Sequence, residues 1–590
     1  MTFGIFCKYL EKLESTASRN EMTIILSEIF SETSSEEAKL TAYLCQGKLG
    51  PAYKSPDFGV ADKSMLKALG LKAQAIFHET GDLGKTIEKL KNQEEKIHVK
   101  NLKISEIYDR LWEVAMISGT GSQDKKQQLI INLLADVDPV SAKYIVKIIL
   151  GKLRTGFSDM TILDGLSWML VGSKSERKQI ERIYNVRADL GEVALVVKDH
   201  KLKIKNLNID PQIGTPILMA RAERAVDATD IWERLNKCAV EYKLDGLRIQ
   251  AHIQCPVPSA QCPVKLFSRG LEDVTHMYPD ICEGLAKQIK HDCIVEGEMI
   301  AIDKQGNFLP FQETVQRKRK YDILEMLESV PLKVFLFDIL AIDGKSLLDL
   351  PNEKRREILE SITPLNPPLT PHLAVRIERG DVRGGNPKGE GDTVQLMERK
   401  IVNSEIEIEK FFQKALKDGT EGIIAKKLNG EYAAGSRDFN WIKYKKSYQK
   451  SALSDTLDVM IMGYDVGQGK RTKFGIGDFL VGVYQPETDK YLTVAKIGTG
   501  LTDEEWRKVK SSVSSNQLPV KPENYEVSKQ MNCDHWVGPK IVVEILADEI
   551  TKSPMHTSGY ALRFPRLVSF REKKPEDSTT FAELKKMFEL

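Results

Sequence analysis

Glu241-Tyr242-Lys243-Leu244-Asp245-Gly246-Leu247-Arg248 predicts a short strand that runs into a tight turn, because Asp-Gly is a common turn pair. Side chains alternate along a strand, so Glu241 and Lys243 point to the same face. A lysine flanked by two carboxylates and an arginine is an unusual polar cluster within an apolar run, and it is a candidate amine nucleophile held by charged partners. A solvated strand end explains the same residues, and Lys-x-Asp-Gly alone is weak evidence for either reading.

Other short motifs follow this stretch in order toward the C-terminus. They are Ser268-Arg269-Gly270, Glu296-Gly297-Glu298, Phe337-Asp338, Glu421-Gly422-Ile423-Ile424-Ala425-Lys426, Trp441-Ile442-Lys443-Tyr444-Lys445 and Arg571-Glu572-Lys573-Lys574. With the first stretch, the series resembles the six nucleotidyltransferase motifs of the ATP-dependent DNA ligases, in particular the archaeal type, which is similar to the eukaryotic replicative enzyme. The resemblance covers nearly the whole chain, since it also includes Pro310-Phe311-Gln312, Arg317-Lys318-Arg319, Ser553-Pro554-Met555-His556-Thr557 and Leu562-Arg563-Phe564-Pro565-Arg566.

The chain divides into three blocks by composition and periodicity. At 590 residues it is long enough for about three or four domains. A helical pattern runs to about residue 205, strand-like and helical runs alternate up to 448, and short strands with glycine-rich turns follow. With linkers at 206–216 and 449–456, we expect domains at 1–205, 216–448 and 453–590. The resemblance implies a multidomain fold: an all-α DNA-binding domain, an α+β nucleotidyltransferase (adenylation) domain and a C-terminal OB-fold β-barrel with a terminal helix.

The helical block has two interpretations. Ile145, Ile148, Ile149 and Leu153 form an apolar stripe, with Lys143, Lys147, Lys152 and Arg154 largely on other faces. By composition alone, the block is a helical scaffold whose lysines are solvated. The resemblance favours a DNA-binding domain that grips duplex phosphates across the minor groove, with Lys152, Arg154 and Gly156 as contact residues.

Composition excludes several classes of protein. The formal net charge is only +2, so a nucleic-acid partner requires local basic surfaces. No apolar run reaches about 18 residues and no signal pattern begins the chain, which predicts a cytoplasmic protein without a membrane partner. The resemblance to DNA ligases implies that it is nucleoid-associated. The eight cysteines include no C-x-x-C pair, so a zinc ribbon is not expected. Cys255 and Cys262 bracket a loop and can pair, although free thiols are the favoured reading in a reducing compartment.

The chemistry expected of Lys243 is attack on the α-phosphate of ATP. A lysine amine attacks phosphorus only when it is unprotonated, which nearby positive charge or desolvation favours. Arg248, Arg269, Lys443, Lys445 and a metal ion are the candidate sources of that charge. The chain has no G-x-x-x-x-G-K-[ST], so no P-loop holds the phosphates, and the resemblance implies scattered Lys and Arg instead.

The resemblance assigns the remaining site residues. Phe337 stacks on adenine and Glu241 accepts from its amino group, which selects adenine over guanine. Glu298 holds ribose or a metal-bound water, Glu421 binds Mg²⁺ (Mn²⁺ as an alternative), and Glu296 is merely structural. The complete set of expected nucleotide-binding residues is Glu241, Arg248, Arg269, Glu298, Phe337, Lys426, Lys443, Lys445, Arg571 and Lys574, with Lys243 catalytic and Glu298 and Glu421 as metal ligands.

One departure from the family pattern lies in the last motif. The family usually ends Arg-x-Asp-Lys, and here Lys573 takes the acidic position. We expect Lys573 to repel Arg571 and Lys574 and to remove any salt bridge that the acid makes. The expected effect falls on self-adenylation or barrel closure, because the nucleophile is unchanged.

The sequence therefore predicts an ATP-dependent DNA ligase that seals 5′-phosphate/3′-hydroxyl nicks through a lysyl-AMP and a DNA-adenylate, in replication, repair and recombination. An mRNA capping guanylyltransferase shares Lys-x-Asp-Gly, but the helical block and Glu241 argue against it. The Arg563-Phe564-Pro565-Arg566 segment argues against an RNA ligase, and the intact Lys243, Lys443 and Lys445 argue against a catalytically silent DNA clamp. Nicked duplex DNA is the expected partner of a monomer; no clear sliding-clamp peptide is present, which leaves a clamp partner open.

Overall fold

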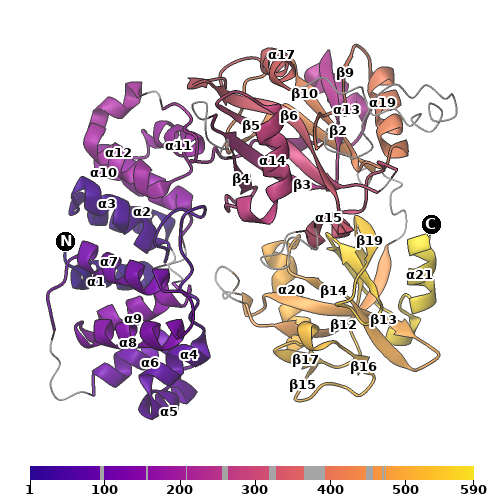
Figure 1. The fold of residues 1–590 in the computed structure, drawn as a ribbon. Helices are drawn as coiled ribbons and strands as arrows, with labels where there is room; N and C mark the ends of the chain where they lie inside the picture. The colour runs from indigo at the N-terminus through magenta and orange to yellow at the C-terminus, as the bar shows by residue number, and fades with distance from the viewer. Residues whose placement is uncertain are drawn as a thin grey trace. The chain divides into compact units, whose positions relative to one another are not determined.

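The computed structural model forms two compact units, one of Met1–Arg224 with Ala228–Lys443 and one of Ala225–Asp227 with Tyr444–Leu590 (Figure 1). It describes the chain except for a set of single residues and short stretches. These are residues 17, 94–98, 154–156, 208, 256–263, 304, 318–326, 328, 364–392, 447–455, 468–470, 472–473 and 590. The alternative pairing of Cys255 with Cys262 therefore lies outside the described residues, because Cys262 is not among them. Nearly all of the predicted linker 449–456 also lies outside them.

The N-terminal part of the first unit is helical, as the sequence predicts. Its helices are α1 (Phe3–Ser15), α2 (Arg19–Ser31), α3 (Ser35–Cys45), α4 (Asp62–Leu69), α5 (Leu71–Thr80), α6 (Leu83–Lys91), α7 (Ile104–Met116), α8 (Ser122–Ala135), α9 (Pro139–Ile149), α10 (Asp159–Val171), α11 (Arg177–Val186), α12 (Leu190–His200) and the 3₁₀ helix η1 (Lys201–Asn206). Polar residues cap many of them; Ser34 and Glu37 form a capping box at α3. The helices pack around one apolar core, with α10 against α2 and α12 against α3.

The lysines of α9 correct one expectation. Lys143 and Lys147 are not on a solvated face, since their side chains are only 11% and 10% exposed. Lys147 Nζ lies 2.6 Å from Glu14 Oε1, and Lys143 Nζ lies 3.4 Å from Glu11 Oε1. Burial requires such charges to be paired, so these two lysines join α9 to α1 and are not available as a phosphate-binding surface.

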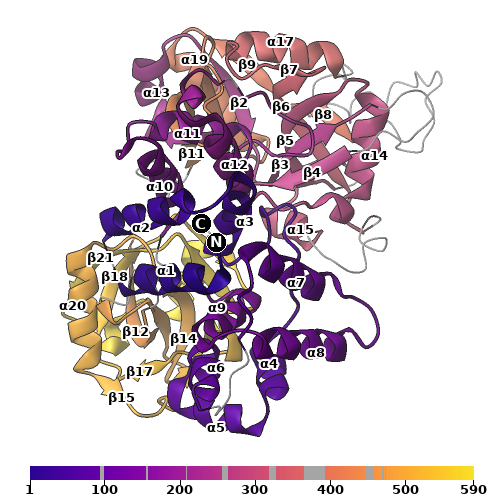
Figure 2. The same cartoon turned by 90° about the vertical axis from the view of Figure 1, so that its left-hand side faces the viewer.

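The rest of the first unit is an α+β domain built on two sheets, as the sequence predicts. One has the order β1 (Arg221–Arg224), β11 (Arg437–Lys445), β10 (Gly422–Lys427), β2 (Cys238–Lys243), β9 (Arg399–Val402). The other has the order β4 (Val264–Ser268), β3 (Leu247–Ile253), β5 (Cys293–Ala301), β6 (Leu332–Ile342), β7 (Lys345–Ser346), with β8 (Val394–Leu396) parallel to β6 (Figure 2). Its helices are α13 (Ala228–Leu235), α14 (Pro279–Gln288), α15 (Phe311–Gln316), α17 (Asn352–Ile362) and α19 (Glu405–Lys417).

The second unit is β-rich, in agreement with the predicted OB-fold domain. Its main sheet contains β12 (Leu457–Asp465), β13 (Asp478–Gln485), β14 (Lys490–Ile497), β15 (Gln517–Leu518), β16 (Tyr525–Glu526), β17 (His535–Val537), β18 (Val542–Leu546) and β21 (Arg566–Arg571). A separate ribbon joins β19 (Glu549–Lys552) to β20 (Tyr560–Arg563), and α20 (Asp503–Ser514) is the longer helix. The predicted terminal stripe forms α21 (Phe581–Glu589), whose Leu584 is fully buried in the core of this unit.

Candidate active site

Lys243 lies at the end of β2, and the pairing of β2 with β10 determines its partner. The two strands are antiparallel with Gly422 opposite Lys243, so the residue before Gly422 is brought beside the lysine. Glu421 N donates to Lys243 O at 3.0 Å, and Lys243 Nζ lies 2.5 Å from Glu421 Oε2. The lysine side chain is 23% exposed, which leaves it accessible to a substrate. The geometry therefore pairs the predicted nucleophile with the predicted metal ligand of a distant motif.

Gly246 allows the second sheet to approach this pair. A Cβ at Gly246 would lie 2.3 Å from Met299 O, so only glycine lets the turn after β2 sit against β5. β3 then pairs antiparallel with β5, with Arg248 opposite Glu298. The Lys-x-Asp-Gly motif thus carries a steric requirement as well as the predicted nucleophile.

Glu298 is the third member of the cluster around Lys243. Burial raises the pKa of its carboxyl to about 7; Lys243 and Arg248 oppose the rise, and Glu421 and Asp245 add to it. Strongly shifted pKa values of carboxyl groups beside a candidate nucleophile are typical of functional sites. The sequence predicted the roles of Glu298 and Glu421 separately, and the fold places both acids in the electrostatic environment of one lysine.

A second cluster lies between the two sheets and involves aromatic rings. Lys426 Nζ lies 4.8 Å from the centroid of the Phe337 ring and 4.4 Å from that of Trp441, and Arg248 lies 5.3 Å from each. Burial lowers the pKa of Lys426, although its ion pair with Glu241, at 2.7 Å, opposes the shift. Phe337, predicted to stack on adenine, is therefore flanked by two cations in the structure.

Glu241 offers an unsatisfied acceptor in this second cluster. Its side chain is only 2% exposed, and no described residue donates a hydrogen bond to the buried Oε1 atom. Arg399 Nε lies 3.9 Å from that oxygen, beyond hydrogen-bonding distance. A buried carboxylate oxygen without a donor fits a ligand that brings one, such as the amino group of adenine.

The remaining predicted site residues are distributed over both units. Arg269 is exposed in the turn after β4, and Lys443 lies on β11 at the end of the first unit. Lys445, Arg571 and Lys574 belong to the second unit, so the first unit does not by itself contain the whole predicted set. Lys152 is exposed and ion-paired with Asp62, whereas Arg154 and Gly156 lie outside the described residues.

The last motif shows a second correction. Lys573 does not simply repel its basic neighbours, because its Nζ lies 2.5 Å from Asp458 Oδ2 on β12. Arg571 Nε lies 3.3 Å from Asp458 Oδ1, so one carboxylate accommodates both cations. Lys573 therefore has an ion pair of its own, which the sequence does not reveal because Asp458 lies 115 positions before it. The predicted loss of a salt bridge made by an acid at this position stays a prediction.

Three residues outside the predicted nucleotide-binding set shape the site. The Trp441 ring makes cation–π contacts with both Arg248 and Lys426. Glu296 is fully buried and its Oε2 lies 2.7 Å from an Arg248 guanidinium nitrogen, so it does more than fill space. Gln250 donates to Glu296 from within β3. The alternation of Arg248, Gln250 and His252 along one strand was the sequence signal that could have indicated this polar face.

A metal site was tested against the described side chains. Among them, no group of three or more His, Cys, Asp and Glu side chains could hold a metal ion. Mg²⁺ commonly takes one or two carboxylates together with waters and substrate phosphates, so Glu298 and Glu421 fit that requirement.

The described helices include none that is long and apolar enough to cross a membrane.

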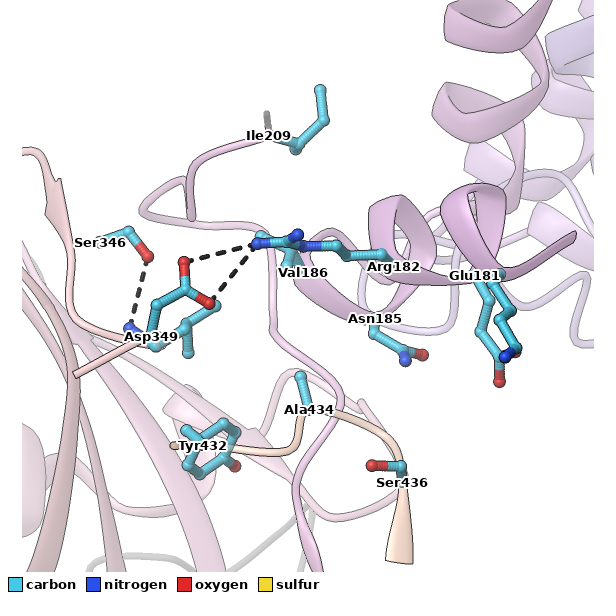
Figure 3. Close-up of a pocket in the computed structure, with 12 residues that line it drawn as sticks. Glu181, Arg182, Asn185, Val186, Ile209, Ser346, Asp349, Tyr432, Ala434 and Ser436 are labelled. Carbon is cyan, nitrogen blue, oxygen red and sulfur yellow. Dashed lines mark hydrogen bonds and ion pairs between the residues drawn. The ribbon is translucent and has the colours of Figure 1, made fainter. Parts of the chain in front are cut away.

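A separate pocket of about 310 Å³ is lined by α11, by β7 and by loops of the α+β domain. Figure 3 shows Arg182 reaching toward Asp349 across it, with the Arg182 guanidinium 3.4 Å from the carboxylate. Its lining includes charges of both signs and none of the motif residues. The nucleotide site predicted from the motifs is therefore not this pocket.

Comparison with known proteins decides the family. Family models match three consecutive regions: DNA ligase N terminus at 2–167, ATP dependent DNA ligase domain at 219–445 and ATP dependent DNA ligase C terminal region at 472–574. The chain belongs to the ATP-dependent DNA ligase family. Its activity is accordingly the ATP-dependent sealing of nicks in DNA, and an enzyme-adenylate intermediate is part of that chemistry.

The similarity to individual ligases extends over the whole chain. It is 42% identical over 607 residues to a probable DNA ligase of Dictyoglomus turgidum, covering 100% of this chain and 97% of the relative. It is 36% identical over 627 residues to a DNA ligase of Hyperthermus butylicus, with the same coverage, which supports the predicted archaeal type. The solved structure titled Pmar-Lig_PreS3 has a TM-score of 0.55 at 16% identity, covering 96% of this chain and 99% of its own, and shares the fold.

Proposed function

We propose that Lys243 is the nucleophile of this ligase. In the first step its Nζ forms a bond to the α-phosphorus of ATP, and the bond to pyrophosphate breaks. The AMP then passes to the 5′-phosphate of a nick, which frees the lysine. In the third step the 3′-hydroxyl attacks that phosphate and AMP leaves. The observation that carries the assignment is the Lys243–Glu421 pair, accessible and beside the buried Glu298.

The adenine is bound, in this proposal, between the two sheets. The Glu241 Oε1 acceptor takes the amino group, and Phe337 supplies the stacking face. Lys426 acts through Glu241, because their ion pair fixes the carboxylate on one side. Arg248, Arg269, Glu298, Lys443, Lys445, Arg571 and Lys574 complete the proposed nucleotide-binding set, with Arg571 and Lys574 orienting the pyrophosphate.

Glu298 and Glu421 are the proposed ligands of Mg²⁺, with Mn²⁺ as an alternative. A bound cation supplies positive charge to the phosphates, which stabilises charge that develops in phosphoryl transfer. Glu421 forms an ion pair with Lys243 in the structure. In this proposal the same carboxylate binds the lysine first and the metal afterwards.

The helical block is the proposed clamp on nicked duplex DNA, with Lys152, Arg154 and Gly156 as contact residues. Lys152 fits this role because its side chain is exposed, unlike those of Lys143 and Lys147. We propose domain limits of 1–205, 216–448 and 453–590. The protein acts, in this proposal, as a monomer at nicks in the nucleoid during replication, repair and recombination. A sliding clamp is a candidate partner.

The decisive experiment replaces Lys243 by Ala and measures transfer of label from α-labelled ATP to the protein in Mg²⁺. Labelling should disappear, while sealing of a nick whose 5′ end is already adenylated should persist, because the last step needs no lysyl-adenylate. Lys427→Ala, at an exposed position of the neighbouring β10, should label like the wild type. Wild-type labelling of the Lys243→Ala protein would refute the assignment.

A further inference from the structure

β3 has one polar face that is buried almost completely. Arg248, Gln250 and His252 alternate along the strand, whereas Ile249, Ala251 and Ile253 on the other face belong to the apolar core. Gln250 and His252 have no exposed surface. An amide and an imidazole at such positions are costly unless their polar atoms are paired, so the partners indicate what the face is for.

Gln250 is paired at both ends of its amide. Its Oε1 accepts from Ile217 N at 2.8 Å, and its Nε2 donates to Ile217 O at 3.1 Å, in the manner of a neighbouring strand. Nε2 also donates to Glu296 Oε1 at 3.3 Å. One side chain therefore connects the backbone that enters the adenylation domain with a buried carboxylate.

His252 extends this arrangement toward the preceding residues. Gly214 N donates to His252 Nδ1 at 3.0 Å, so the proton lies on Nε2, which donates to Gln250 Oε1 at 2.9 Å. Burial lowers the pKa of His252 to about 3, which keeps the ring neutral. The donor and acceptor directions are consistent from Gly214 to Glu296.

Glu296 accepts hydrogen bonds from both Gln250 and Arg248 and so links the two side chains. Glu296 Oε2 accepts from Arg248 at 2.7 Å, and the same guanidinium donates to Ala220 O at 2.8 Å. Arg248 lies over both the Phe337 and the Trp441 rings. The polar face of β3 thus holds the backbone of 214–220 at Gly214, Ile217 and Ala220. The contact at Ala220 also holds Arg248, which borders the proposed adenine site.

The same segment is also held by the helical block. Ala188 N donates to Pro216 O at 3.0 Å, and Leu218 N donates to Asn185 O at 2.8 Å. Pro216–Leu218 is therefore hydrogen-bonded to the end of α11 and the residue that follows Arg187 on one side, and to Gln250 on the other. A shift of this segment cannot leave both sets of hydrogen bonds intact.

We propose that Gln250 is a positioning residue for self-adenylation: by fixing Ile217 and Glu296 together it holds Arg248 in the nucleotide site and links that site to the segment arriving from the helical block. The inference rests on the proposed function, in which Arg248 and Phe337 face the nucleotide. Gln250 itself touches neither ATP nor DNA in this proposal.

Gln250→Leu keeps the approximate volume and removes every hydrogen bond of the amide. The ATP concentration for half-maximal self-adenylation should rise about ten-fold, as expected for a disrupted buried hydrogen-bond network, while the rate at saturating ATP stays within about two-fold. Ile249→Val, on the apolar face of the same strand, is the matched control for lost stability and should leave ATP affinity unchanged.

A double-variant cycle separates positioning from general damage. If Gln250 acts through Arg248, Arg248→Met with Gln250→Leu should need no more ATP than Arg248→Met alone. Glu296→Gln, which keeps the side-chain shape and breaks the charge pair with Arg248, should reproduce the rise, and it substitutes for Gln250→Leu if that protein does not fold.

Multiplied effects in the double variant or an equal rise in Ile249→Val would overturn the inference. So would unchanged ATP affinity in a folded Gln250→Leu protein or, where that protein does not fold, in Glu296→Gln. These outcomes are independent of the proposed nucleophile, because Lys243→Ala would still abolish labelling. Retained labelling in Lys243→Ala would instead remove the basis for the inference itself.

Discussion

At the residue scale, the proposed active site contains three ion pairs. Lys243 and Glu421 form one pair, Lys426 and Glu241 a second, and Arg248 with Glu296 a third. Each pair joins residues from two motifs that are far apart in sequence. Removing one member would leave its partner charged and partly or fully buried, which costs more than the pair contributes.

His252 gives a prediction about pH. Its pKa is about 3 in the folded protein against 6.5 for the free side chain. Between these two pH values the unfolded chain therefore binds nearly one proton more than the folded protein. Stability from this group is fully present above pH 6.5 and is lost as pH falls toward 3. Between pH 7 and pH 5 the loss should be about 2 kcal/mol.

Calorimetry of the full chain at several pH values would measure this slope. His252→Asn should lower the unfolding temperature of the adenylation domain at pH 7 and flatten its dependence on pH between 7 and 5. His78→Asn, at an exposed position of α5, should preserve the wild-type slope. An unchanged slope in His252→Asn would contradict the assignment of a buried neutral imidazole.

Lys573 also belongs to this scale. Lys573→Asp would replace the cation that pairs with Asp458 by an acid and leave Arg571 to balance Asp458, Glu544 and the new carboxylate. Because Lys573 and Arg571 are about two-fifths exposed, the effect on folding should be only about 0–1 kcal/mol. We expect the self-adenylation rate to change while sealing of pre-adenylated nicks stays closer to wild type, since a small bias shifts a two-state closure several-fold.

Parallel assays of labelling and of pre-adenylated nick sealing would check the Lys573 prediction. Lys586→Asp, an equal charge change at an exposed position of α21, is the control and should alter neither rate. Equal rates for Lys573→Asp and wild type in both assays would show that the departure from the family pattern has no functional effect.

At the element scale, strand register determines which motifs meet. The β2–β10 pairing places Gly422 opposite Lys243, and a shift by one residue would turn Glu421 away from the lysine. The β3–β5 pairing likewise sets Arg248 opposite Glu298. The C-terminal helix α21 also depends on its neighbours, because its apolar stripe is buried against the core of the second unit.

Leu584 tests the docking of α21. Its side chain is fully buried, so Leu584→Ala should destabilise the second unit by roughly 2–5 kcal/mol through lost burial and a residual cavity. Thermal unfolding followed by tryptophan fluorescence would report this loss, because Trp506 lies in the same core. Lys586→Ala on the exposed side should be nearly neutral, and a similarly small effect at Leu584 would mean that α21 is not an integral part of the unit.

At the scale of the whole molecule, the ligase separates nucleotide chemistry from the proposed grip on DNA. The helical block contains its own core, and the adenylation motifs lie after residue 216. The segment between them is nonetheless part of the adenylation domain's structure. Ile209 and Ile213 pack on the cluster that includes Ile217 and Trp441, and Gly214 donates to His252.

A fragment without the helical block should therefore begin near residue 207, not at Ile217. We expect residues 207–590 to self-adenylate but to bind nicked duplex poorly, and full-length binding to weaken steeply with salt because phosphate contacts dominate it. Electrophoretic mobility shifts at several salt concentrations, with labelling as the folding control, would measure both. Binding by the fragment as tight as that of the full chain would exclude the helical block as the DNA clamp.

The sequence by itself determined the family, the three kinds of domain and the candidate nucleophile. Those features are local: the Lys-x-Asp-Gly stretch, the ordered short motifs, the helical periodicity and the alternating strands can each be read without knowing what packs where. The helical runs that it predicted before residue 448 include α17 and α19, because hydrophobic periodicity reflects one buried face.

Only the tertiary structure decided which charges are paired and which are buried. Lys143 and Lys147 read as solvated lysines, yet they are buried against acids of α1, and Lys573 read as a repulsive charge, yet Asp458 pairs with it. Gln250 and Glu296 read as ordinary strand residues, yet they connect Ile217 with Arg248. Pairing and desolvation depend on groups that are far apart in the sequence or on neighbouring strands. The local sequence does not indicate which distant group the fold brings within hydrogen-bonding distance.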